Sequence, residues 1–142
     1  ILRRLVGSEM CIRDSIPNAI GMNNHQGSKA SADQHVMSNV AKAMKDREMF
    51  FIDSRTTVET IGETTMEVFG VPTARRNIFL DNEDDEEKIE KQLMKLVKRA
   101  EKDGSAIGIG HAKPKTLNVL SDQIPRLKKM GYKFEFVSNM LH

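Results

Sequence analysis

Short apolar runs alternate with longer amphipathic stretches along most of this chain. The apolar runs predict five strands, over residues 19–23, 49–52, 77–80, 106–109 and 134–137. The stretches between them repeat apolar residues every three or four positions, which predicts four helices whose apolar faces begin at Val36, Val58, Ile89 and Leu117. Residues 49–52 are all apolar, as in a strand covered on both faces. Strands and helices in alternation predict an α/β fold with a parallel sheet.

The expected helix starts carry residues that suit the positive end of a helix dipole. Ser31 and Gln34 have the spacing of a capping box at the first helix. Residues 82–85 are acidic or amide-bearing and are expected to begin the third helix. Asp81 and Asn82 fit either an N-cap of that helix or a chemical role, and we favour the cap.

Glycine and proline mark the expected helix ends. Gly70 and Gly104 each follow an apolar helix face and are predicted to stop those helices. Pro125 is predicted to kink or split the fourth helix. The charged run at 83–102 is interpreted as the solvated face of the third helix, since many of its charges are four residues apart.

The charge and hydropathy of the chain argue against a nucleic-acid partner and against a transmembrane segment in these residues. There are 22 basic and 20 acidic residues in 142, so the chain lacks the basic excess that would indicate binding to nucleic acid. The apolar runs are too short to form a transmembrane segment.

Residues 5–15, LVGSEMCIRDS, resemble the in-frame translation of a transposase adapter used for sequencing libraries. We therefore expect residues 1–15 to lie outside the domain, and the natural protein to begin near Ile16; the alternative is a genuine basic N-terminal segment. Removing the three arginines and two acidic residues of 1–15 leaves 19 basic and 18 acidic residues. Cys11, the one cysteine, is removed as well, which excludes disulfides and thiolate chemistry and leaves the compartment open.

Four of the expected strands end in polar clusters, and parallel sheets place their active sites at that edge. The clusters are Asn23-Asn24-His25, Asp53-Ser54-Arg55, Asp81-Asn82 and Gly110-His111.

A loop histidine such as His25 is more often bonded to backbone than to a metal, but His111 at an equivalent place favours a shared centre. Asp53 and Arg55 fit a functional pair or a structural ion pair equally well. His35 and His142 are given no chemical role.

Motifs for other chemistries are missing from the sequence. No serine lies in a Gly-x-Ser-x-Gly elbow, and no glycine pattern matches a dinucleotide-binding or P-loop fingerprint.

Four segments, 21–28 (GMNNHQGS), 51–56 (FIDSRT), 77–82 (NIFLDN) and 106–111 (AIGIGH), resemble the divergent polysaccharide deacetylase family in order and spacing. The resemblance covers residues 16–142 and implies a partial (β/α) barrel, truncated at the N-terminus. It implies an exported enzyme in which a divalent metal, with zinc expected, activates water to attack N-acetyl groups on a carbohydrate.

Carried onto this chain, the resemblance implies a role for each matching residue. His25 is the expected metal ligand, although Gln26 replaces the methionine more usual in that loop. His111 is the expected acid for the leaving amine, with Asp53 and Arg55 as its catalytic support. Asp53 is the expected carboxylate beside His111.

We also assign Asn23, Asn24 and Ser28 to substrate binding. The family's acidic pair and a second histidine motif do not occur in 16–142, so we expect them upstream and predict that this fragment alone is inactive and folds poorly.

Two alternatives from other classes stay open. The first is a non-catalytic barrel that binds glycan or protein, and an upstream acidic pair would argue against it. The second is a phosphatase-like hydrolase with Asp53 or Asp81 as nucleophile, which lacks the expected second aspartate two residues on.

Overall fold

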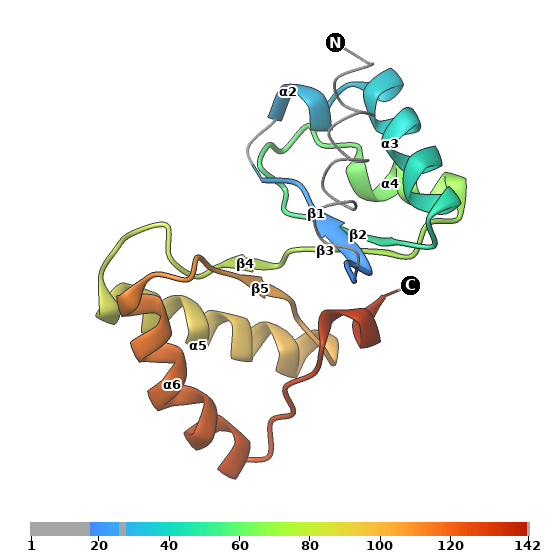
Figure 1. Cartoon of the computed structure of the whole chain (residues 1–142). Helices are drawn as coiled ribbons and strands as arrows, with labels where there is room; N and C mark the ends of the chain where they lie inside the picture. Colours follow the sequence, from blue (N-terminus) through green and yellow to red (C-terminus); the bar gives the residue numbers. More distant parts are fainter. Residues whose placement is uncertain (1–17, 26–27, 142) are drawn as a thin grey trace. The chain divides into compact units, whose positions relative to one another are not determined.

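A computed structural model describes residues 18–25 and 28–141, which form two compact units (Figure 1). The first unit contains the residues up to Arg75 together with Leu141, and the second contains Arg76–Met140. The expectations for residues 1–15, Gln26 and His142 fall outside the described residues.

The first unit is built on a parallel sheet of three strands in the order β1-β2-β3. Its strands are β1 (Gly21–Asn23), β2 (Phe50–Asp53) and β3 (Thr73–Arg75). The helices between them are α2 (Ser28–Ser31), α3 (Gln34–Asp46) and α4 (Gly62–Phe69). The register pairs Asn23 with Ile52 and Asp53 with Arg75, so the three strands end within one residue of one another at the same edge of the sheet.

The core of the first unit follows from the apolar face of α3. Met37, Val40, Ala41 and Met44 lie one helical turn apart and are all buried. They form one cluster with Phe51 of β2 and Met66 of α4, among other residues. This packing fixes the strand from which Asp53 emerges.

The second unit contains a two-stranded parallel sheet and two long helices. Its elements are β4 (Ile78–Phe79), α5 (Glu86–Asp103), β5 (Gly108–Ile109), α6 (Pro114–Lys129) and the 3₁₀ helix η1 (Val137–Met140). Leu80, Ile89, Leu93, Val119 and Leu127 form its buried core. The core therefore joins the strand that precedes Asp81 to both helices.

The predicted α/β class is confirmed, since parallel strands alternate with helices, and Gly70 and Gly104 end α4 and α5 with left-handed φ angles of 70° and 84°. The described strands form two separate sheets and no closed barrel. Of the two outcomes predicted at Pro125, the split is wrong, because α6 continues through it, and the kink stays a prediction.

One predicted strand and one helix start are also wrong, and one strand was not predicted. β3 was missed because Thr73-Ala74-Arg75 has no apolar run. Residues 134–137 form no strand, and Phe136 is 83% exposed, because an alternating apolar stretch makes a strand only beside a partner. Val58, expected to begin a helix face, lies 90% exposed in a turn ahead of α4.

The predicted N-caps are wrong as well. Asp33 caps α3, where its carboxylate accepts a hydrogen bond from the Val36 N–H at 2.9 Å. Asp85 caps α5 in the same way, accepting from the Lys88 N–H at 3.0 Å. Both carboxylates sit three residues before the N–H they accept. Asp81 is therefore left for another role.

Candidate functional site

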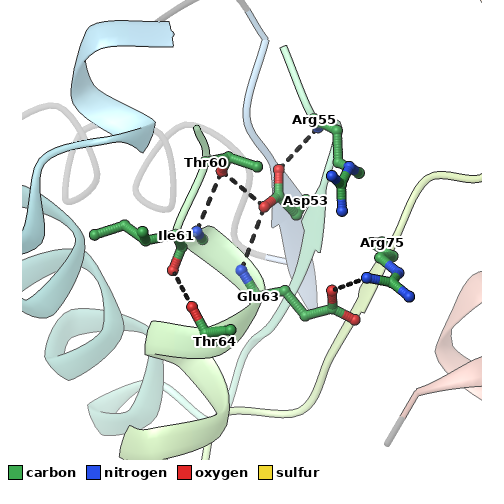
Figure 2. A network of polar contacts seen from close by, with 8 residues as sticks. Asp53, Arg55, Thr60, Ile61, Glu63, Thr64 and Arg75 are labelled. Atoms are coloured by element: carbon green, nitrogen blue, oxygen red, sulfur yellow. Dashed lines mark hydrogen bonds and ion pairs between the residues drawn. The ribbon is translucent and has the colours of Figure 1, made fainter. Parts of the chain in front are cut away.

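Asp53, at the end of β2, is the centre of a polar network in the first unit (Figure 2). The residue is 1% exposed. Its Oδ1 accepts from the Arg55 N–H at 2.8 Å, and its Oδ2 accepts from the Thr60 hydroxyl at 2.8 Å and the Glu63 N–H at 3.3 Å. Both oxygens of this carboxylate are therefore engaged by the protein itself.

This network ties the loop after β2 to the first turn of α4. Arg55 has a positive φ of 48°, a conformation that the Asp53 side chain favours by bonding the N–H two residues on. The α4 N-cap, Ile61, makes no side-chain capping bond, so Asp53 satisfies the Glu63 N–H from the neighbouring strand. Gly62 is needed here, because a Cβ at that position would lie 2.6 Å from Asp53 Oδ2.

The two asparagines after β1 connect that strand to β2. Asn24 Oδ1 accepts from the Ser54 N–H at 2.6 Å, and its Nδ2 donates to Ser31 Oγ at 2.9 Å and to Asp53 Oδ1 at 3.4 Å. Asn23 Nδ2 donates to Ser54 Oγ at 2.9 Å. The amide of Asn24 thus maintains the loop, while Asn23 is the more exposed of the pair.

The remaining residues predicted for this face are placed as follows. His25 is exposed two residues after β1, and the Ser28 hydroxyl donates to the Thr56 carbonyl oxygen at 3.2 Å. Glu63 pairs with Arg75 at 3.6 Å (Figure 2). The roles assigned to His25, Ser28 and Arg55 stay predictions.

The described residues do not fit a complete metal site. Among them, no three His, Cys, Asp or Glu side chains gather closely enough to hold an ion. A catalytic zinc takes about three protein ligands. Asp53 is a poor metal ligand, because both its carboxylate oxygens already accept hydrogen bonds from the protein. His25 would need partners that the described part of the chain does not supply.

The second unit brings a buried carboxylate onto a histidine. Asp81, two residues after β4, is 3% exposed, and its Oδ1 lies 3.0 Å from His111 Nδ1. Asp81 Oδ2 accepts from the His111 N–H at 2.7 Å and from the Thr116 hydroxyl at 2.8 Å. The β4–β5 register pairs Phe79 with Ile109, and continuing it by two residues brings Asp81 opposite His111.

The hydrogen bonds keep Asp81 ionised. Burial by itself raises the pKa of this carboxyl group, but the His111 N–H, the Thr116 hydroxyl and the His111 ring together outweigh it and lower the pKa. An anionic partner at Nδ1 favours the tautomer that carries a proton on Nδ1 and a protonatable lone pair on Nε2. Nε2 is therefore the nitrogen suited to proton transfer.

The His111 side chain is 40% exposed, so a ligand can reach it. The Phe79 ring centroid lies 5.5 Å from that of His111, and the Arg76 guanidinium lies 5.2 Å from the Phe79 centroid. Gly110 precedes His111, and a Cβ there would meet Thr116 Cγ2 at 3.2 Å. Phe79 is thus a neighbour of an imidazole that stays partly exposed.

His111 lies two residues after β5, near a strand end as the sequence predicted. The carboxylate that contacts its ring is Asp81, which we expected to cap a helix. The support expected from Asp53 stays a prediction. Thr116 was missed altogether. The signal for Asp81 was its position after β4, which matches that of His111 after β5, whereas a buried threonine on a helix carries no sequence signal.

Comparisons with known proteins agree with this architecture. The family model described as divergent polysaccharide deacetylase matches residues 10–141. An uncharacterized protein of Haemophilus influenzae is 38% identical over 76% of this chain and 39% of its own length. The uncharacterized protein YibQ of Escherichia coli K12 is 33% identical over 80% of this chain and 36% of its own length.

The crystal structure of an uncharacterized Agrobacterium tumefaciens C58 protein shares the fold, with a TM-score of 0.83 at 22% identity, over 85% of this chain and 49% of that one. This chain therefore spans less than half the length of each of these relatives. None of its described helices has the length and apolar character needed to cross a membrane. With the matching model covering nearly the whole sequence, the chain belongs to the divergent polysaccharide deacetylase family.

Proposed function

We propose that the complete protein hydrolyses N-acetyl groups on a carbohydrate, and that this chain supplies the proton-transfer part of its active site. The observation that supports this most is the contact between Asp81 Oδ1 and His111 Nδ1. Family membership is the second support.

Hydrolysis of an N-acetyl group requires a proton donor, and the Asp81–His111 pair is suited to that role. Water adds its oxygen to the acetyl carbonyl carbon, the C–N bond then breaks, and acetate and the sugar ammonium leave, so that both protons of the water end on the amine nitrogen. An amine leaves poorly as an anion, so the nitrogen must receive a proton as the bond breaks. His111 Nε2 is the proposed donor, and Asp81 stabilises the imidazolium before the transfer and orients the ring.

The metal requirement is a separate part of the proposal and rests on the family resemblance alone. His25 is the proposed ligand from this chain, with zinc as the expected ion, and the described residues do not complete its coordination. The proton-transfer role of His111 does not depend on that assignment. Export is also part of the proposal and rests on the same family resemblance.

The test is acetate release from N-acetylated oligosaccharides and from peptidoglycan by the complete protein. His111→Gln and Asp81→Asn are expected to lower kcat by roughly 10²- to 10⁴-fold, the usual contribution of general acid–base catalysis. His35→Gln is the matched control, because His35 is an exposed residue on α3. Wild-type turnover in His111→Gln would refute the assignment. Tight glycan binding without acetate release would favour the binding-module alternative.

A further inference from the structure

We infer that Thr116 is a positioning residue, whose hydroxyl fixes the rotation of the Asp81 carboxylate and through it the tautomer of His111. This inference deepens the proposed function and rests on it for its catalytic meaning. Its structural content, the link from Thr116 to Asp81 to His111, lies within the second unit.

The two oxygens of Asp81 are used differently. Oδ2 accepts from the His111 N–H at 2.7 Å and the Thr116 hydroxyl at 2.8 Å, while Oδ1 faces Nδ1 at 3.0 Å. The terminal torsion of an aspartate is soft and roughly two-fold, so a single donor leaves the carboxylate free to pivot. Two donors from different elements, the end of β5 and the first turn of α6, define the plane of the carboxylate.

Thr116 is itself firmly held. It is 1% exposed and lies two residues after Pro114, which begins α6. Its methyl group packs beside Gly110, where the missing Cβ gives it room. The helix therefore holds the Thr116 hydroxyl in one place, and its hydrogen bond fixes the orientation of the Asp81 carboxylate.

The tautomer of neutral His111 is the property through which the role of Thr116 can be measured. With Oδ1 fixed against Nδ1, neutral His111 keeps its proton on Nδ1 and its lone pair on Nε2. When the carboxylate can pivot, the Nε2–H form becomes populated and the lone pair moves to the wrong nitrogen.

The experiment is a long-range ¹H–¹⁵N correlation of the histidine side chains in the complete protein, at a pH where the rings are neutral. His111→Gln identifies the His111 signals. Wild type is expected to show the Nδ1–H form, and Thr116→Val, which replaces the hydroxyl by a methyl group, is expected to give a mixture of tautomers.

A second pair of variants keeps the test valid if Thr116→Val does not fold. Thr116→Ser and Thr116→Ala both lose the methyl group beside Gly110, and only the serine keeps the hydroxyl. Serine is expected to restore the Nδ1–H form and alanine is not. An unchanged tautomer in both alanine and valine, or equal shifts in serine and alanine, would overturn the inference.

These results are independent of turnover. A tautomer shift in Thr116→Val together with wild-type acetate release by His111→Gln would leave the inference standing and refute the proposed function. An unchanged tautomer in Thr116→Val together with lost acetate release in His111→Gln would refute the inference and leave the proposed function standing.

Discussion

Removing the Asp53 carboxylate is expected to destabilise the first unit by about 3 kcal/mol. Two of its hydrogen bonds, from Arg55 N–H and the Thr60 hydroxyl, are 2.8 Å long, and those from Glu63 N–H and Asn24 Nδ2 are 3.3 and 3.4 Å. A hydrogen bond to a charged group contributes roughly 1.5–3 kcal/mol. The two short bonds therefore account for about 3–6 kcal/mol.

The lower end of that range applies, because Arg55 and Thr60 are half-buried and water can satisfy part of what they lose. Domains have total stabilities of about 5–15 kcal/mol, so the expected loss is a large fraction. Asp53→Asn keeps one carbonyl oxygen as an acceptor and should lose about half as much as Asp53→Ala.

The assay is urea unfolding of Asp53→Ala, Asp53→Asn and wild type, followed by circular dichroism and extrapolated linearly to water. Asp46→Ala is the control, since Asp46 is exposed at the end of α3, and its free energy of unfolding should stay within about 0.5 kcal/mol of wild type. A loss below about 1 kcal/mol in Asp53→Ala would show that the network does not stabilise the fold as argued.

Gly62 provides a second check on the same contact. A Cβ there would lie 2.6 Å from Asp53 Oδ2, so Gly62→Ala should destabilise wild type by about 1–3 kcal/mol. In the Asp53→Ala background that clash is gone, and the substitution should cost at least about 1 kcal/mol less. Additive effects in the double-mutant cycle would contradict the contact.

Three further predictions concern the second unit. Asp81 has a pKa below its ordinary value of 3.8, so its ionised form stabilises the fold above that pH, and this stabilisation is lost as pH falls through the folded-state pKa. The difference in unfolding free energy between wild type and Asp81→Asn should therefore be largest near neutrality and shrink in acid, and parallel pH curves would contradict it. Ile89 is 0% exposed in the core, so Ile89→Ala should lower the free energy of unfolding by about 2–5 kcal/mol in the same urea assay. Met130 is 72% exposed, so Met130→Ala should lower it by less than about 0.5 kcal/mol. Gly104 has a φ of 84°, so Gly104→Ala should lower the free energy of unfolding by about 1 kcal/mol and Gly104→Asn by less. A lower melting temperature for Gly104→Asn than for Gly104→Ala would refute the left-handed cap.

The sequence predicted those parts of the fold that depend on local pattern. Apolar residues at helical spacing located α3, α5 and α6, because a helix that packs against a core must bury one face. Gly70 and Gly104 were predicted as helix ends, because few other residues adopt a positive φ cheaply.

The errors arose where structure depends on a partner distant in the sequence. β3 is a strand because Phe51 lies beside Thr73, and nothing within Thr73-Ala74-Arg75 indicates it. Residues 134–137 have a strand-like pattern but pair with no strand in the described part of the chain, so they form none. Both outcomes are set by pairing, which periodicity does not encode.

The site shows the same division. The positions of Asp53, Asp81 and His111 near strand ends were visible in the sequence. Which carboxylate meets the histidine depends on the register of β4 against β5, and which aspartate caps α5 depends on where its first turn begins. Asp81 and Asp85 are only four residues apart, and the tertiary structure decides between them.

Asp53 and Asp81 show how similar positions acquire different chemistry. Each is a buried aspartate at or just after the end of a parallel strand, and each accepts a threonine hydroxyl and a backbone N–H. In Asp53 these two bonds fall on different oxygens, and Asn24 Nδ2 and the Glu63 N–H add a second donor to each, so both oxygens are occupied by the protein. In Asp81 the two bonds fall on the same oxygen, and the other oxygen contacts the imidazole. Asp53 thereby stabilises a loop, while Asp81 orients the group that we propose transfers the proton.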